Sequence, residues 1–387
     1  MWQPPQLSIP NEDRISALPD SLLYHVLSFL TTKDSAATSI LSKKWKPLWL
    51  SQLILRFDDQ PFQEALTFSN FVNSVIANRD KTLPIRSFHL KCCFLNRDIH
   101  DFLYTAVKSG VENLTIDLCN SGYSIMTLPS FILSTKTLSV LKLNRITLNE
   151  IPYFYLPSLK VLHLNIVKFT YYEYLLKLLS GCPILQDLET DCLSVYSPYS
   201  KEERQIISLS NLITANICNV FIPTEFDWFH NVERLRVELM VDEKVPNTLD
   251  NIVMFHNLTY MELIFRAQNP LLIFKCLMKL LQYCPKLQIL IIDKVITPRE
   301  YFHDKDWEEQ EIVPKCLLSY LSTCSLRNYW GITCELHFAK YIMKNSRVLS
   351  AMKIQSAKFL DTTTKLQMKK ELSLCLKNST TCKLLFI

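Results

Sequence analysis

The chain has 387 residues, and with 48% hydrophobic residues it can fold around a core and lacks the composition of a disordered protein. This length exceeds the size at which one compact core usually keeps growing, which favours several domains or an elongated repeat array. The 42 Lys and Arg and the 37 Asp and Glu are interspersed, so the net charge of +5 argues against binders of nucleic acid or membrane surfaces.

The first residues, MWQPPQLSIPNEDR, lack the basic flank and the apolar stretch of a signal peptide. No later segment approaches the ~20 uninterrupted apolar residues of a membrane-spanning helix. We therefore expect an intracellular protein, in the cytoplasm or the nucleus, without a membrane partner.

Residues 14–49 predict three short helices. Pro19 suits the first position of a helix, where its missing N–H costs nothing. Thr32 is expected to cap the second helix, and Trp45 and Trp49 lie one turn apart in the third. The first helix has an apolar stripe made of Leu22, Leu23, Val26, Leu27 and Leu30. Helices this short bury little surface alone, so we expect a partner to complete them.

The ordered motif in this segment, DRIS-LPD-LL---LSFL-T-KD----SILSKKW--LW, closely resembles the F-box of plant F-box/leucine-rich-repeat proteins. The resemblance implies a small all-helical F-box over residues 11–55 that binds the Skp-type adapter of a cullin ubiquitin ligase. Thr31 and Lys44 stand where the family usually has proline and arginine. The resemblance also implies that eight residues form or support the adapter-binding face, namely Leu18, Pro19, Leu22, Leu23, Leu27, Ile40, Leu41 and Trp45. Some of these residues would equally serve as the core of an ordinary helical bundle.

After an expected linker helix region over residues 56–84, the pattern apolar-x-x-apolar-x-apolar recurs nine times, at intervals of 20 to 29 residues. Its period-two end suits a strand, and its spacing is that of leucine-rich repeats. The nine copies start at Ile85, Val111, Leu138, Leu159, Leu185, Leu212, Val232, Leu258 and Leu287. The sequence thus predicts an α/β fold over residues 85–300, a leucine-rich-repeat solenoid with a curved parallel sheet and helical or irregular returns.

Two of the returns are helix-compatible and share a Cys-Pro-x-Leu-Gln element. Pro183 and Pro285 are expected to stop these helices before the following strands. Strand residues between the apolar positions must point outward, and as a set they predict a surface that binds a target protein. This set is Lys142, His163, Glu189, Asp191, Arg236, Glu238, Glu262 and Asp293. For any single member, a plain solvated position is the alternative interpretation.

The C-terminal residues 301–387 resemble the FBD domain found at the end of many plant F-box/leucine-rich-repeat proteins. The similarity includes Val313–Leu317 and extends to Cys382–Phe386. Leu349, Met352 and Ile354 reproduce the repeat pattern once more, so we expect this segment to cap the end of the solenoid.

No catalytic or metal-binding motif stands out. The 4 glycines lie in no phosphate-binding spacing, and the sequence has no Cys-x-x-Cys, His-Glu-x-x-His or Gly-x-Ser-x-Gly element. The 13 cysteines are scattered through apolar surroundings and are interpreted as small buried hydrophobic residues. We expect no catalytic residue, no metal and no cofactor.

Together with the resemblance to the F-box family, these observations predict that the chain is the substrate-recognition subunit of a Skp-cullin-F-box ubiquitin ligase. The target protein stays open, as does participation of a small molecule. Two other classes are a repeat scaffold that acts without the ligase and an enzyme on the solenoid. The F-box motif argues against the first, and the missing catalytic motifs argue against the second.

Overall fold

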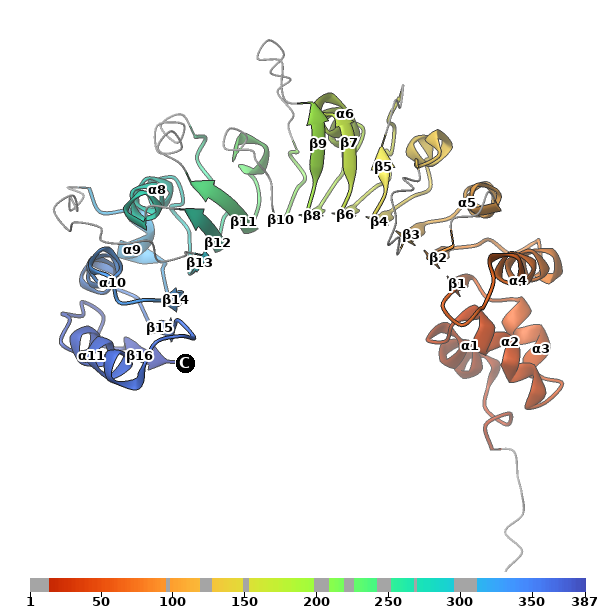
Figure 1. Cartoon of the computed structure of the whole chain (residues 1–387), viewed down its shortest axis with the longest axis horizontal. Helices are drawn as coiled ribbons and strands as arrows, with labels where there is room; N and C mark the ends of the chain where they lie inside the picture. Colours follow the sequence, from red (N-terminus) through yellow and green to blue (C-terminus); the bar gives the residue numbers. More distant parts are fainter. Residues whose placement is uncertain are drawn as a thin grey trace, which may run out of the picture. The chain divides into compact units, whose positions relative to one another are not determined.

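The structure is a computed structural model that describes residues 14–94, 98–118, 127–148, 153–197, 209–218, 226–241, 252–267, 270–295 and 312–387. The chain divides into two compact units, residues 1–146 and residues 147–387. Each unit is an α/β structure with a parallel sheet, as the sequence predicts. The two units are described in turn (Figure 1).

The N-terminal unit begins with a helical module and continues as a small parallel sheet. The module comprises α1 (Asp20–Ser28), α2 (Thr32–Ala37), the 3-10 helix η1 (Thr38–Ile40) and α3 (Trp45–Leu50). The sheet has the order β1 (Ile54–Asp58), β2 (Ser87–Cys92), β3 (Asn113–Leu118) and β4 (Val140–Asn144). The connections contain α4 (Ala65–Asn78), α5 (Asp98–Lys108) and η2 (Ser130–Ser134).

The C-terminal unit is built on a longer parallel sheet. Its strands are, in order, β6 (Val161–Asn165), β8 (Asp187–Asp191), β10 (Thr214–Ile217), β11 (Arg234–Val241), β12 (Tyr260–Ala267), β13 (Ile289–Val295), β14 (Thr323–Tyr329), β15 (Ala351–Ser356) and β16 (Lys383–Phe386). A second parallel sheet contains β5 (Thr147–Leu148), β7 (Lys168–Tyr171) and β9 (Ser194–Ser197). The returns contain α6 (Tyr172–Ser180), η3 (Phe226–Phe229), α8 (Pro270–Gln282), α9 (Lys315–Ser319), α10 (Thr333–Asn345) and α11 (Thr362–Ser373).

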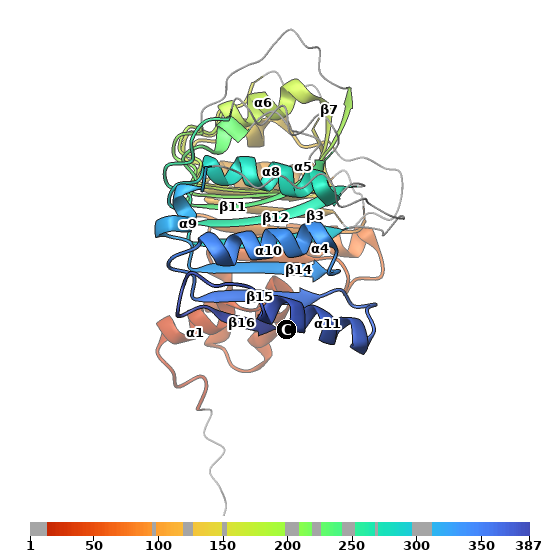
Figure 2. The ribbon, with the colours of Figure 1, turned by 90° about the vertical axis from the view of Figure 1, so that its left-hand side faces the viewer.

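The helices of the C-terminal unit cover one face of its main sheet. Figure 2 shows α8, α10 and α11 lying along the strands on the same side. Alternate residues of each strand point toward this helical layer and are buried, as Leu235 and Val237 are on β11. The opposite face carries no helix in the described residues, and we call it the strand face.

All nine predicted repeat motifs contain a strand of the main parallel sheets. In each one the strand begins two residues after the first apolar residue, as β2 at Ser87 follows Ile85 and β13 at Ile289 follows Leu287. The first apolar residue is itself buried in every copy, because it lies where the chain turns from the return into the strand. The same spacing recurs in β14 and β15, after the buried residues Leu321 and Leu349. Residues 312–387 therefore extend the parallel sheet beyond the nine motifs.

The two predicted helical returns are confirmed as α6 and α8, each of which ends before its Cys-Pro pair. The predicted cap at Thr32 is wrong, because Thr31 occupies that place and accepts a hydrogen bond from the Asp34 N–H at 3.1 Å. The Thr32 hydroxyl is buried and instead accepts the backbone N–H of Arg56 at 2.8 Å. This bond holds the helical module to β1.

A strained left-handed residue recurs at the ends of four strands, directly after β4, β6 and β8 and at the last residue but one of β14. Arg145, Ile166, Cys192 and Asn328 have positive φ angles of 58°, 51°, 51° and 49°. Each lies seven residues after the first apolar residue of its motif. The left-handed region costs about 1–2 kcal/mol for residues other than glycine, and it is least natural for the β-branched Ile166.

Candidate functional site

The helical module has a compact core that contains three of the eight residues predicted to form or support its adapter-binding face. Leu23, Leu27 and Trp45 are buried together with Leu48, and Leu18, Leu30 and Trp49 pack against them. The Trp45 indole N–H donates to the Ser16 hydroxyl at 2.9 Å, which satisfies the polar group of this buried ring. These three residues support the module from inside and do not present a surface.

The exposed residues of the module form the surface that a partner can contact. Leu22 is 49% exposed, Ile40 is 88% exposed and Leu41 is 60% exposed, and Pro19 is also exposed. Val26 and Phe29 are exposed as well, and with Leu22 they have the spacing of one helical side of α1. The sequence prediction included neither Val26 nor Phe29 in this surface, although their spacing from Leu22 gave the signal.

Lys44 fastens the segment that precedes α1. Its ammonium group donates to the carbonyl oxygens of Ser16 at 3.0 Å and Leu18 at 2.9 Å. It also forms an ion pair with Asp20 at 3.1 Å. An ammonium group has three donors, so these contacts match its full capacity. Lys44 therefore makes structural contacts at the position where the family usually has arginine.

Lys142 lies on β4 in the N-terminal unit and is the only predicted target-binding residue there. It is half-buried on a row of register-paired residues that also contains Arg56, His89 and Thr115. Burial, with the charges of Arg56 and Lys142, lowers the pKa of His89. This row is therefore basic.

The strand face of the C-terminal unit begins with His163 on β6 and an acidic region on β8. The His163 imidazole lies 3.4 Å from the Glu189 carboxylate and 3.6 Å from that of Asp187. Asp191 follows on the same side of β8 and is half-buried. The structure thus brings together three of the predicted residues, His163, Glu189 and Asp191, and adds Asp187.

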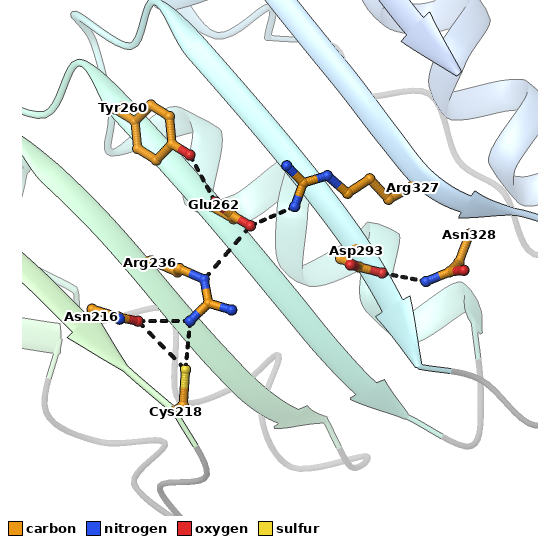
Figure 3. A network of polar contacts seen from close by, with 8 residues as sticks. All are labelled: Asn216, Cys218, Arg236, Tyr260, Glu262, Asp293, Arg327 and Asn328. Carbon is orange, nitrogen blue, oxygen red and sulfur yellow. Dashed lines mark hydrogen bonds and ion pairs between the residues drawn. The ribbon is translucent and has the colours of Figure 1, made fainter. Parts of the chain in front are cut away.

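Further along the strand face, Glu262 is the centre of a network of polar contacts (Figure 3). Its carboxylate accepts a hydrogen bond from Arg327 at 2.7 Å and one from the Tyr260 hydroxyl at 2.7 Å, and Arg236 lies 3.6 Å away. Burial alone raises the pKa of Glu262. The hydrogen bond from Tyr260 and the charge of Arg327 outweigh this effect and hold the pKa below its ordinary value.

Arg236 links this network to β10. Its guanidinium donates to the Asn216 side-chain oxygen at 2.8 Å and to the Cys218 sulfur at 2.8 Å. Burial raises the pKa of the Cys218 thiol, so at neutral pH the sulfur is a neutral acceptor. Both acceptors orient the guanidinium across the face of the sheet.

Two predicted outward-pointing residues are in fact buried. Glu238 is paired with Arg266, and Glu262 lies beneath two arginines, so the face that meets solvent is formed by the arginine side chains. Asp293 stays half-buried and accepts a hydrogen bond from Asn328 at 2.6 Å. The sequence pattern placed these carboxylates on the correct face of their strands, but local spacing carries no information on which residues of neighbouring strands cover them.

The residues that sequence reasoning missed on this face are chiefly Tyr260, Arg234 and Arg327. Tyr260 and Arg234 occupy variable positions of the repeat motif, so the pattern could have found them. Arg327 lies outside the nine motifs, on β14, and reaches Glu262 across 65 residues of sequence. Only the stacking of the strands brings it there.

In the described part of the chain, no group of three or more His, Cys, Asp and Glu side chains is arranged to hold a metal ion. Most of the cysteines there are buried, and Cys119 lies outside the described residues. Burial raises the pKa of the Cys276 and Cys316 thiols to about 12. No helix among the described residues has the length and apolar character needed to cross a membrane.

Comparison with known proteins identifies three family signatures in the chain. Residues 15–57 match the F-box domain, residues 158–183 match the leucine-rich repeat, and residues 308–354 match FBD. The chain is 30% identical to the probable FBD-associated F-box protein At1g32375 of Arabidopsis thaliana, over 97% of this chain and 100% of the relative. It is 31% identical to the Arabidopsis thaliana F-box/FBD/LRR-repeat protein At3g52680, over 88% of this chain and 85% of the relative.

Proposed function

Because the chain belongs to the plant F-box proteins with leucine-rich repeats and an FBD domain, we propose that it is the substrate-recognition subunit of a Skp-cullin-F-box ubiquitin ligase. Residues 11–55 bind the Skp-type adapter and, through it, a cullin. Residues 85–300 bind a target protein, and residues 301–387 complete the end of the array. The chain contributes binding and no catalytic group, and it works in the cytoplasm or the nucleus, where its buried free cysteines stay reduced.

The observation that carries the proposal is the apolar surface of the helical module. Leu22 and Val26 lie exposed on α1, Phe29 lies exposed directly after it, and Ile40 and Leu41 lie exposed after α2. Exposed apolar patches on a folded domain mark sites where another protein binds, since leaving them in water is unfavourable. The core beneath them is complete without these five residues. Their apolar character therefore supports docking and not folding.

A double substitution, Leu22→Asp with Ile40→Asp, tests adapter binding. It places two charges in the interface without touching the core, and an uncompensated buried charge costs several kcal/mol. We expect the variant to lose the Skp-type adapter in a pull-down from purified components. The matched control is Leu366→Asp with Leu376→Asp, which changes two exposed leucines outside the module. Adapter capture by the Leu22 and Ile40 variant at the level of the control would contradict the assignment.

Substitution of Leu27 is not an equivalent test. Its side chain is fully buried in the module core, so Leu27→Asp would unfold the module and abolish binding indirectly. Thermal unfolding of each variant separates these two causes, because the Leu22 and Ile40 variant is expected to unfold at the temperature of the unchanged protein.

Proximity labelling in plant cells distinguishes a ligase subunit from a scaffold that acts alone. The unchanged chain is expected to label the adapter, a cullin and its target proteins, whereas the Leu22→Asp, Ile40→Asp variant is expected to label the targets alone. A scaffold without the ligase would label neither adapter nor cullin in either form. Keeping the module in place preserves its bond to β1, which a deletion would remove.

A further inference from the structure

Cationic side chains gather on the strand face between β11 and β15. They are Arg234, Arg236, Arg266, Arg327 and Lys353. The described acidic residues on the same face of these strands are Glu238, Glu262 and Asp293. The difference, five minus three, leaves an excess of two positive charges. This part of the surface therefore attracts anionic groups.

The depth of the charges strengthens this attraction. The side chains of Glu238 and Glu262 are 6% and 10% exposed, whereas those of Arg266 and Arg236 are 49% and 37% exposed. A partner that approaches the face thus meets guanidinium groups before carboxylates. Each guanidinium has five N–H donors in a planar fork that fits a carboxylate, and the contacts described for Arg327 use one nitrogen.

Apolar residues lie between the cations. Ile264, Ile289 and Ile291 are half-buried on the strand face, where Ile289 is paired in register with Tyr260 and Ile291 with Glu262. The Arg234 guanidinium lies over the face of the Tyr260 ring, 4.2 Å from the ring centre. Partly exposed apolar and aromatic groups ringed by arginine are typical anchors of protein interfaces. The surface therefore suits a ligand that alternates acidic and apolar groups.

The acidic region on β8 limits the length of such a ligand. Asp187, Glu189 and Asp191 repel a segment of the same sign that extends beyond β10. From β11 to β15 there are four strand spacings, or about 19 Å at ~4.8 Å each. An extended chain covers this distance with about six residues at ~3.3 Å per residue.

We propose that the strand face over β11 to β15 recognises an extended segment of about six residues in the target protein, rich in Asp and Glu and interrupted by apolar side chains. The acidic groups pair with Arg234, Arg327 and Lys353, and the apolar groups pack on Ile289 and Ile291. This inference rests on the proposed function, since it names the kind of target that the repeats select.

Labelled peptides test the inference directly on the full chain in complex with its adapter. The probe is a ten-residue peptide that alternates Glu with Leu, and its counterparts replace every Glu by Gln or by Lys. Fluorescence anisotropy at low and at physiological salt measures each affinity. We expect the Glu peptide to bind at least about tenfold more tightly than the Gln peptide, and this difference to shrink as salt rises.

A charge-reversal variant locates the site. Arg234→Glu with Lys353→Glu removes two cations for which no carboxylate partner is described, so no buried acid loses its partner. The control, Lys275→Glu with Lys340→Glu, makes the same change of net charge on exposed residues of α8 and α10. We expect the first variant to weaken Glu peptide binding about tenfold or more, and the control to weaken it less than about twofold.

Three outcomes overturn the inference, namely equal binding of the Glu and Lys peptides, equal losses in the two variants, and tighter binding of a ten-nucleotide oligothymidylate than of the Glu peptide. The last result would make the patch a nucleic-acid surface. Retention of the adapter in every sample separates the two proposals. If the adapter binds and the peptide preference is absent, only this inference fails. If the adapter does not bind, the proposed function itself fails.

Discussion

At the scale of single residues, Lys294 and Glu335 form a buried ion pair in the C-terminal unit. Both side chains are fully buried, and the ammonium group of Lys294 donates to the Glu335 carboxylate. The second carboxylate oxygen accepts the backbone N–H groups of Trp330 at 2.9 Å and Gly331 at 2.7 Å. Burial lowers the pKa of Lys294, because removal from water disfavours the charged ammonium. The pair connects β13 to α10, and of these two elements α10 lies in the segment that matches FBD.

We predict that breaking this pair destabilises the unit strongly and that replacing both partners does so much less. Lys294→Met or Glu335→Gln alone leaves one buried group without its partner, for which losses of about 3–5 kcal/mol are typical. The double variant keeps an amide oxygen for the two N–H groups and removes both charges. Urea unfolding monitored by circular dichroism gives each free energy of unfolding. Additive losses in the double variant would contradict the coupling.

The residue scale is also where sequence reasoning was least complete. It placed Glu238 and Glu262 on the strand face, yet both are covered by arginines that lie 28 and 65 residues further along the chain. Alternation within a strand predicts the side to which a residue points. It does not predict the length and charge of the residues that neighbouring strands place beside it. Their part in binding a target stays a prediction.

At the scale of secondary-structure elements, the main strands were predictable and the second sheet was not. The nine strands followed from one pattern, because burial of every second residue leaves a period-two signal. The strands β5, β7 and β9 are only two to four residues long, which is too short for such a signal. They follow the left-handed residues Arg145, Ile166 and Cys192. These residue types do not predict a turn, since none is glycine, asparagine or aspartate.

We predict that Gly181→Ala destabilises the end of α6. A Cβ atom at this position would lie 2.7 Å from the carbonyl oxygen of Phe154, a distance that forces the two backbones apart. The Leu156 N–H donates to the Gly181 carbonyl at 2.8 Å and would be displaced with it. Overpacking of this kind costs about 1–3 kcal/mol. Urea unfolding should show this loss for Gly181→Ala and a change below about 0.5 kcal/mol for the exposed neighbour variant Ser180→Ala.

At the scale of the whole molecule, the order of F-box, repeats and FBD segment could be predicted because each carries its own motif. The polar network of the strand face could not, since Asn216, Arg236, Glu262 and Arg327 belong to four different strands and meet only through the register of the sheet. Sequence motifs thus predict which repeats exist. Their stacking determines which side chains become neighbours.

We predict that the chain self-associates when it is purified without its adapter. Phe29 and Ile40 are 73% and 88% exposed, and apolar groups left in water favour association. Light scattering coupled to size-exclusion chromatography should show concentration-dependent assemblies for the lone chain and a single species for its complex with the adapter. Phe29→Ser with Ile40→Ser should reduce the assembly of the lone chain. A monomer at every concentration, before any substitution, would contradict the prediction.

The interval between the first apolar residue of each motif and its strand is fixed, and this restricts the insertions and deletions that the gene can tolerate. Insertion or loss of a single codon inside a strand would exchange the buried and exposed sides of every residue that follows it in that strand. Duplication or loss of a whole repeat, such as the 26 residues between Ile85 and Val111, keeps each side chain on its own face. Repeat proteins of this design can therefore lengthen, shorten or recombine their strand faces in steps of one repeat while the strands keep their pairing.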